Sequence, residues 1–474
     1  RSASHLWGML TARTQATLHE ELGDHRIRVA QIGPAGERLA PLAAVMHDIN
    51  RAAARTGLGA VMGSKRLIAI AVRGFSKPVV HDPIAVNRLA KWYAKEYPNT
   101  WANNLQSVGT ANGVMSHQHA GGLPSYNFQK GTFEGWEAIS GDTMTETILK
   151  DRDACPVHCK RVVEIQEGPF KADPVYGGPE YETIGSFGSM CGIDNLAAIA
   201  HANQLCNAYG LDTISTGVTI AWAMDCFERG LLTKADTGGL ELRFGNAEAM
   251  VQAVELMGRR ESFGDLLSQG SRRAAAQIGR GTEKLAVHVK GQEVPMHEPR
   301  LKYALGIGYA VSPTGADHNH NFHDSDYTTE EALKPLARYG FTKPLSIQDL
   351  GPEKMRMASI EIPWSVTMNM MGFCGFVFFT YDRPRLVELL QAVTGWNIQE
   401  EELLRAGERA YTMARAFNIR EGFSRADDQL PAIFSQPFES GPSAGNFLDP
   451  DQVEAALTKF YELMGWDPKN GIPL

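Results

Sequence analysis

The sequence lacks most of the features that mark several common protein classes. Its 474 residues include only six cysteines, too few for a disulfide framework, so we expect reduced thiols in the cytoplasm. The longest apolar stretch of the C-terminal half, residues 372–379, is far too short to span a bilayer. No Lys/Arg-rich run is present, and the net charge of −8 argues against a nucleic-acid or anionic-membrane surface. The composition therefore predicts a soluble globular protein with neither nucleic-acid nor membrane partners.

The chain also lacks an initiator methionine and a signal-peptide pattern at Arg1. Its first residues are typical of the interior of a chain. We therefore expect that the natural chain is longer or that an N-terminal piece has been removed.

Neither a low-complexity segment nor a solenoid period is visible, and most of the chain has helical patterns. Alternation and short apolar runs predict strands at 25–32, 67–72 and 285–289, the second of buried type. Helices are predicted at 41–55, 195–209, 215–229, 247–259, 385–393, 400–417 and 451–464. A Pro-containing connector at 77–83 and a Pro/His/Gly-containing stretch after residue 289 indicate boundaries. The pattern predicts an α+β chain that is predominantly α-helical.

Two cysteines, Cys155 and Cys159, share a short loop with Pro156. Thiolates held in this way suit an iron–sulfur cluster or zinc. Zinc would require a second Cys/His pair at zinc-finger spacing, and none follows. The pair alone does not decide whether the loop binds metal.

A near-repeat joins residues 207–212 to residues 369–374, which share the form Asn-x-x-Gly-apolar-(Asp/Cys). A glycine at a helix end lets backbone amides approach a ligand closely. Two copies indicate two similar ligands, or one ligand with two similar arms. Two unrelated helix C-caps are the alternative.

Two polar stretches contain candidate proton-transfer groups. Glu182, in the Gly-containing stretch 180–188, suits a general acid or base, and a solvated capping loop is the alternative. His318 and His320 lie in the polar cluster 317–324, which is compatible with a zinc or iron site or with an ordinary polar loop. His297 is a further candidate. We favour one catalytic histidine over a cluster of metal ligands.

Together these residues resemble the tungsten-containing aldehyde:ferredoxin oxidoreductase family. The resemblance follows the chain in order, through residues 59–65, 155–159, 181–185, 192–196, 210–215, 242–246, 315–318, 372–374 and 415–422. It implies that the family's β-rich N-terminal region, which covers one face of the pterin, is largely absent. Residues 1–76 would be its C-terminal remnant. A helical domain at 77–288 would carry the iron–sulfur site and first pterin motif, and one at 289–474 the catalytic histidine and second motif.

The resemblance also implies the cofactors. A tungsten (or molybdenum) bis-molybdopterin would contact Arg55 and the paired motifs, through Asn207, Gly210, Leu211, Asp212, Asn369, Gly372 and Phe373. The family often has Asp where this chain has Asn207 and Asn369. An iron–sulfur cluster would bind Cys155, Cys159 and Cys374, but Arg152 occupies the family's first cysteine position. The cluster would then be a [4Fe-4S] form with a fourth ligand from Asp151, Asp153, His158 or water, or a [3Fe-4S] form.

The implied activity is oxidation of an aldehyde with water to a carboxylic acid, with electrons passing through the cluster to ferredoxin or an electron-transfer subunit. Glu182 resembles the family's catalytic glutamate, with Tyr181 beside it, and His318 its catalytic histidine. His297 lies where some members have a substrate-lining tyrosine. A homodimer is compatible with this interpretation. The alternatives are a tungsten-dependent aromatic acyl-CoA reductase subunit, a degenerate non-catalytic subunit, and a zinc protein using Cys155, Cys159, His318 and His320.

Overall fold

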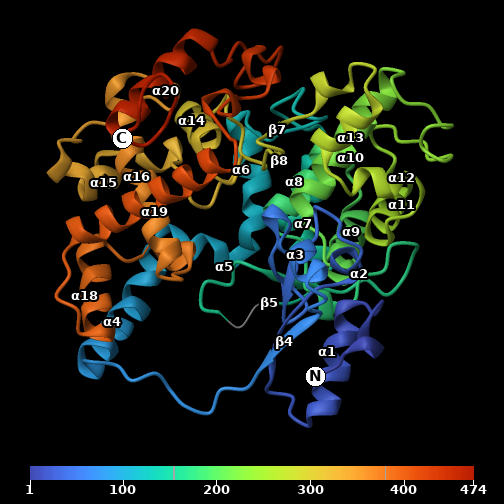
Figure 1. Cartoon of the computed structure of the whole chain (residues 1–474), viewed down its shortest axis with the longest axis horizontal. Helices are drawn as coiled ribbons and strands as arrows, with labels where there is room; N and C mark the ends of the chain where they lie inside the picture. The colour runs from blue at the N-terminus through green and yellow to red at the C-terminus, as the bar shows by residue number, and fades with distance from the viewer. Residues whose placement is uncertain (153–154, 379) are drawn as a thin grey trace.

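A four-stranded antiparallel sheet dominates the N-terminal part of the chain (Figure 1, blue). The computed structural model describes residues 1–152, 155–378 and 380–474. The strand order is β3-β2-β1-β4, and Ala30 of the inner strand β1 pairs with His47 of β2 and Ile70 of β4. The elements here are α1 (Thr11–Leu22), β1 (Arg28–Gln31), α2 (Pro34–Glu37), β2 (Val45–His47), β3 (Arg51–Ala53), α3 (Leu58–Ser64) and β4 (Ala69–Val72).

Two expectations for this region are wrong. The helix predicted at 41–55 is replaced by strands β2 and β3, which meet at a turn where Asp48 and Ile49 have positive φ. Alanine's helix propensity is a weak preference, and pairing of β2 with β1 overrides it. Strand β4 lies at the sheet edge and is not buried, since Ile70 is 49% and Val72 57% exposed.

The middle of the chain is helical, and α10 lies buried at its centre against α8. Asp212 caps α10 by accepting hydrogen bonds from the amides of Ile214 and Ser215, and α9 ends at Gly210 with φ +73°. The elements are α4 (Pro83–Glu96), α5 (Leu105–Val108), α6 (Asn112–Ala120), α7 (Gly141–Thr147), β5 (Leu149–Arg152), β6 (Arg161–Val163), α8 (Tyr181–Phe187), α9 (Leu196–Tyr209), α10 (Thr213–Glu228), α11 (Ala247–Arg259), α12 (Ser262–Leu267), α13 (Ser271–Ile278), β7 (His288–Val289) and β8 (Gln292–Glu293).

The C-terminal part is also helical and includes α4 in its packing, because α4 lies against α18 (Figure 1). Its elements are α14 (Tyr303–Val311), α15 (Glu330–Leu333), α16 (Pro352–Met370), α17 (Gly375–Phe378), α18 (Arg383–Thr394), α19 (Glu400–Arg420) and α20 (Pro450–Leu463). The predicted helices of the middle and C-terminal parts are confirmed within a few residues, as is the predominantly helical α+β class. None of the helices described here has the length and apolar character that crossing a bilayer requires.

The close contact between helices α16 and α19 depends on the absence of a side chain at Gly407. Thr367 on α16 donates a hydrogen bond to the carbonyl of Leu403 on α19 at 3.0 Å. A Cβ at Gly407 would overlap the carbonyl oxygen of Pro363 and Oγ1 of Thr367. We predict that Gly407→Ala lowers the free energy of unfolding by roughly 1–3 kcal/mol. Chemical denaturation measures this, with Gly74→Ala, which meets no atom within 4 Å, as the control. Equal stability of the two variants would contradict the packing.

Candidate functional site

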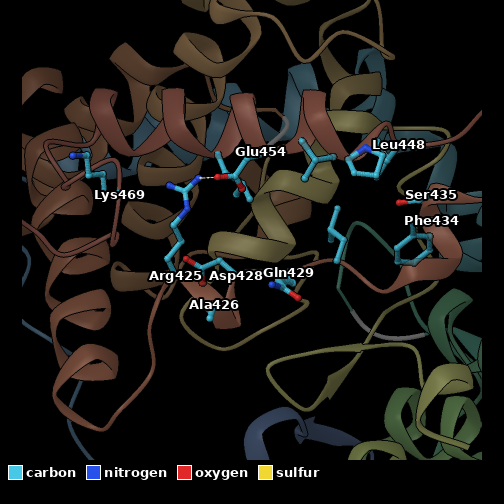
Figure 2. A pocket seen from close by; sticks show the side chains of 13 residues that line it. Arg425, Ala426, Asp428, Gln429, Phe434, Ser435, Leu448, Glu454 and Lys469 are labelled. Carbon is cyan, nitrogen blue, oxygen red and sulfur yellow. Dashed lines mark hydrogen bonds and ion pairs between the residues drawn. The ribbon is translucent and has the colours of Figure 1, made fainter. Parts of the chain in front are cut away.

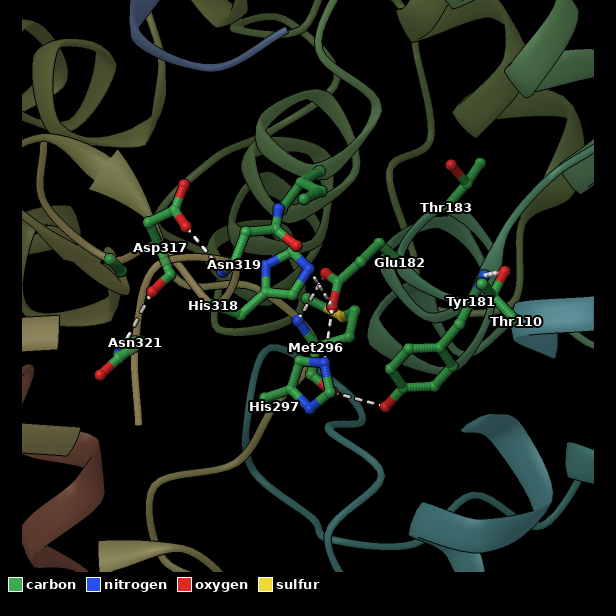
Figure 3. Close-up of polar contacts among 12 residues, drawn as sticks. Thr110, Tyr181, Glu182, Thr183, Met296, His297, Asp317, His318, Asn319 and Asn321 are labelled. Atoms are coloured by element: carbon green, nitrogen blue, oxygen red, sulfur yellow. Dashed lines mark hydrogen bonds and ion pairs between the residues drawn. The ribbon is translucent and has the colours of Figure 1, made fainter. Parts of the chain in front are cut away.

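Three segments that are distant in the sequence bring Glu182, His297 and His318 together (Figure 3). Glu182 lies in the first turn of α8, His297 in the loop after β8, and His318 in the loop after α14. One oxygen or nitrogen atom from each side chain lies within 4.8 Å of the others. The structure therefore places three of the four predicted catalytic residues in one group, and the fourth, Tyr181, is adjacent to Glu182.

The backbone of Met296 orients this group. Its amide donates to Oε2 of Glu182 at 2.8 Å, and its carbonyl accepts the hydroxyl of Tyr181 at 2.5 Å. Oε1 of Glu182 lies 3.3 Å from Nε2 of His297 and 3.8 Å from Nε2 of His318. The two imidazole rings stack with their centroids 5.1 Å apart. Both histidines consequently face the same carboxylate oxygen.

Burial determines the protonation of the group. It raises the pKa of Glu182, an effect opposed by the nearby His318 and by the hydrogen bond from Met296. Burial lowers the pKa of His318, against the influence of Glu182, and it lowers the pKa of His297 well below the ordinary value, with Lys302 acting in the same direction. A carboxyl group beside neutral imidazoles can give or take a proton without leaving an isolated buried charge.

Three neighbours of this group were not singled out from the sequence. His117 on α6 stacks on Tyr181 at 4.8 Å, and burial lowers its pKa to about 3. Lys302 and His323 lie beside His297, with a centroid distance of 4.9 Å between the two imidazoles. His323 belongs to the polar cluster 317–324, whereas no local pattern marks His117 or Lys302.

His320 is turned away from the group. Its Nδ1 lies 3.3 Å from Asp317 and its Nε2 lies 3.4 Å from the hydroxyl of Ser312. Within the described residues, no set of closely spaced ligand atoms joins His318 or His320 to Cys155 or Cys159. The zinc alternative therefore has no assembled site.

The first Asn-x-x-Gly motif is packed against the N-terminal sheet region. The carbonyl of Gly210 accepts from the amide of Ala44 at 2.8 Å, and the Leu211 backbone forms a bridge with Ala43. The buried amide of Asn207 donates to the carbonyl of Tyr176 at 2.9 Å. That amide group is thus already engaged within the protein.

Arg55 connects this motif to the segments that carry His297 and His318. Its Nε lies 3.5 Å from Asp212, and its guanidinium donates to the carbonyls of Ala316, at 2.7 Å, and Glu293. The predicted pterin contact Arg55 therefore lies between the first motif and His318.

The second motif is open. Asn369, at the end of α16, is exposed and donates to the carbonyl of Ser365 at 3.0 Å. Gly372 has φ +65°, and a Cβ built there would meet no atom within 4 Å. The rings of Phe373 and Tyr381 pack edge to face, with their centroids 5.9 Å apart. The two motifs share a sequence pattern but differ in packing, and only the second leaves its glycine accessible.

Buried polar atoms without partners gather between Arg55 and His318. Nε of Arg55, Oε1 of Glu182 and Nδ1 of His318 have no hydrogen-bond partner among the described residues. The charge of Arg55 also acts on the pKa of both Glu182 and His318, so the three lie in one electrostatic environment. Buried polar groups are normally hydrogen-bonded. These atoms fit a polar cofactor or substrate at this position.

The predicted cluster ligands Cys155, Cys159 and Cys374 are a separate candidate site. Cys155 and Cys159 pack in a small cluster with Tyr93 and Tyr97. Burial, followed by Glu180 and then by the thiols of Cys374 and Cys155, raises the pKa of Cys159 to about 11. Arg152 ends strand β5 and is exposed, and Asp153 lies outside the described residues. The donor set fits three soft ligands and does not fit a cluster bound by four thiolates.

A cavity of about 530 Å³ lies elsewhere, between α20 and the 3-10 turns η12 (Arg425–Asp427) and η13 (Ala432–Ser435) (Figure 2). Three of the charged side chains that line it are paired, Arg425 with Glu454 and Asp428 with the buried Arg415. None of the predicted site residues lines it.

Comparisons with known proteins agree along the whole chain. The family model "Aldehyde ferredoxin oxidoreductase, N-terminal domain" matches residues 1–74, and the model of its domains 2 and 3 matches residues 86–474. Proteins named tungsten-containing aldehyde ferredoxin oxidoreductase from Thermococcus kodakarensis and Pyrococcus furiosus are each 36% identical over 488 residues. Each alignment covers all of this chain and 76% of the relative.

Two further similarities are more distant. A P. furiosus protein named aliphatic sulfonate oxidoreductase, WOR-like subunit, is 29% identical over 501 residues, covering all of this chain and 75% of the relative. A solved structure of the active site complex BamBC of benzoyl coenzyme A reductase with 1,5-dienoyl-CoA matches with a TM-score of 0.78. It covers all of this chain and 76% of that chain, and at 24% identity the TM-score shows a shared fold.

Arg152, which occupies the family's first cysteine position, allows the predicted cluster to be tested. A guanidinium stays protonated in proteins and cannot replace a thiolate ligand. We predict that the protein holds a [3Fe-4S] cluster, or a [4Fe-4S] cluster with one labile iron, and that Arg152→Cys converts it to a four-cysteine [4Fe-4S] cluster that resists oxidative iron loss. EPR and Mössbauer spectra measure this, with the exposed Arg420→Cys as control. A stable four-thiolate cluster in the parent protein would contradict the assignment.

Proposed function

This chain belongs to the aldehyde ferredoxin oxidoreductase family, and from that membership we propose that it oxidises an aldehyde with water to a carboxylic acid. The observation that supports this most is the buried group of Glu182, His297 and His318, in which a carboxyl of raised pKa faces neutral imidazoles. The overall change is RCHO + H₂O → RCOOH + 2H⁺ + 2e⁻. Such a reaction needs a base, a donor for the carbonyl oxygen and an electron sink.

The residues that would hold the cofactors follow from the site. Arg55, Asp212 and the open Gly372 would contact a tungsten- or molybdenum-bound bispterin, and Cys155, Cys159 and Cys374 an iron–sulfur cluster. When bound, the metal-pterin group supplies the two-electron chemistry. The protein supplies position and proton transfer.

Glu182 acts as the proton acceptor in this proposal. Its Oε1 has no hydrogen bond among the described residues, while Oε2 is held by the Met296 amide, so one oxygen is fixed and the other is available. The ionised form takes a proton from water as water attacks the carbonyl carbon. Because burial raises its pKa, the carboxylate is a stronger base than an exposed glutamate.

His318 orients and polarises the aldehyde. Its Nε2 faces Glu182, so the unpartnered Nδ1 is the ring nitrogen available to a substrate oxygen. Since burial keeps the ring neutral, an Nδ1–H can donate to the carbonyl oxygen as negative charge develops there. His297 and Tyr181 close the site around the carboxylate (Figure 3).

Ferredoxin or a similar protein is the proposed electron acceptor, because the two relatives that are 36% identical over the whole chain are named for it. Reduction of an aromatic acyl-CoA is the second candidate, supported by the shared fold with the benzoyl coenzyme A reductase complex. The two reactions are separated by assay with each substrate.

Replacing the proposed base tests the mechanism. We predict that Glu182→Gln lowers kcat for aldehyde-dependent dye reduction about 10²–10⁴-fold, the usual contribution of a general base, without loss of cofactor. The parent rate should fall on acidification through the raised pKa of Glu182, because protonation removes the base, and Glu182→Gln should lack this acidic limb. His318→Ala should slow the reaction by a similar order.

The matched control is Glu248→Gln, since Glu248 is an exposed second residue of helix α11 just as Glu182 is the second residue of α8. Its rate should equal that of the parent. Activity of Glu182→Gln within a few-fold of the parent would make Glu182 a structural carboxylate. Reduction of an aromatic acyl-CoA without any aldehyde oxidation would favour the second candidate.

A further inference from the structure

Lys302 is a buried lysine without a carboxylate partner. Lys302 is 6% exposed, and no Asp or Glu oxygen lies within 4.0 Å of its amino group in the described parts of the chain. The buried Lys290 and Lys354, in contrast, pair with Asp428 at 2.7 Å and Asp324 at 3.0 Å. The neighbours of Lys302 are imidazoles instead, because Nζ lies 3.5 Å from Nδ1 of His297 and 3.5 Å from Nδ1 of His323. A buried amine in contact with two ring nitrogens is positioned for proton exchange.

The other ring nitrogens are also engaged. Nε2 of His323 lies 2.7 Å from the carbonyl oxygen of His318, which can only accept, so Nε2 carries the hydrogen and Nδ1 offers its lone pair to Lys302. Nε2 of His297 faces Oε1 of Glu182 at 3.3 Å. Glu182, His297 and Lys302 therefore lie in sequence, with 3.3 Å between Oε1 of Glu182 and Nε2 of His297 and 3.5 Å between Nδ1 of His297 and Nζ of Lys302.

We propose that Lys302 is a positioning residue that sets the tautomer of His297 and relays protons between Glu182 and the exterior of the protein. This inference rests on the proposed function, in which each turnover releases protons at a buried carboxylate. The resemblance of this chain to the family implies no role for Lys302 or His323.

The relay step is balanced without any electron transfer. The proton of Glu182 moves to Nε2 of His297, and the hydrogen on Nδ1 of the same ring moves to the neutral amine of Lys302. The products are a carboxylate, a neutral imidazole of the other tautomer, and an ammonium ion. Once the ammonium has lost its proton to the exterior, the His297 ring must return its hydrogen from Nε2 to Nδ1 before the next transfer.

The charges around Lys302 suit both states. Burial lowers the pKa of Lys302, which makes the neutral amine accessible, while Asp326, Asp324 and Glu182 favour the ammonium form. The other titratable groups facing it, His117 and His323, are neutral, since burial lowers the pKa of each to about 3. Asp326, an exposed residue, lies in the 3-10 turn η10 (Asp324–Tyr327) that follows His323, and burial of its carboxyl group raises its pKa.

Three substitutions at Lys302 test the relay. Lys302→Met removes the amine at similar length, and Lys302→Arg keeps a positive charge that cannot be given up. Both should lower kcat about 10–100-fold, within the range of a single proton-transfer contribution, and leave KM little changed. Added methylamine should rescue Lys302→Ala. Parent-like activity of Lys302→Arg would show that charge alone is required and would overturn the relay.

The control for loss of a buried lysine is Lys290→Met. It removes the ion pair with Asp428, so it should lower stability, and methylamine should not change its rate. If methylamine stimulated Lys302→Ala and Lys290→Met equally, the proposal would be overturned.

A readout that does not use activity separates this inference from the proposed function. NMR of the full chain labelled with ¹⁵N-histidine reports the tautomer and pKa of His297. Lys302→Met should raise that pKa, because Lys302 lowers it, and should mix the tautomers of His297 and His323. An unchanged His297 signal contradicts the inference even in an active oxidoreductase. The expected change in a protein that oxidises no aldehyde supports the positioning of His297 and contradicts the proposed function alone.

Discussion

The burial of one carboxyl group, that of Glu182, is the constraint on which the rest of the site depends. A buried carboxylate is costly unless hydrogen bonds or nearby charges stabilise it. The first turn of α8 provides only the position, and the compensation comes from the Met296 amide, His318 and Arg55, which lie on other segments. The Tyr181 hydroxyl bonds the loop that carries His297, and Arg55 bonds the loop that carries His318, so the backbone of each loop is held in place. The site is thus formed by loops that contact one another and are supported by a helical core.

Much of the fold could be predicted because the long helices carry their own signals. Helix α9 begins at the Asn195 cap and ends at Gly210, and α10 begins at the Asp212 cap, so local residues define these boundaries. The segment 41–55 lacks such signals. Its alanines favour a helix, while pairing with β1 fixes it as two strands, and no local pattern reports that pairing. The exposure of β4 likewise depends on its place at the sheet edge.

The same distinction applies to the site. Glu182, His297 and His318 lie in short motifs, so the sequence identifies them and the fold brings them together. Lys302 and His117 have no motif, and their relevance arises only from packing against His297 and Tyr181. The paired motifs around Gly210 and Gly372 look equivalent in sequence, yet the first is packed against the N-terminal sheet region and the second is open. Sequence similarity between the motifs could not predict that difference.

The central claim is that the buried group around Glu182 serves a metal-pterin oxidoreductase. Elemental and pterin analysis of the anaerobically purified full chain tests it most directly. We predict that the protein contains stoichiometric tungsten or molybdenum together with a pterin and that it oxidises aldehydes. A purified, folded protein that oxidises aldehydes with neither metal bound would contradict the claim that this group serves a metal-pterin centre.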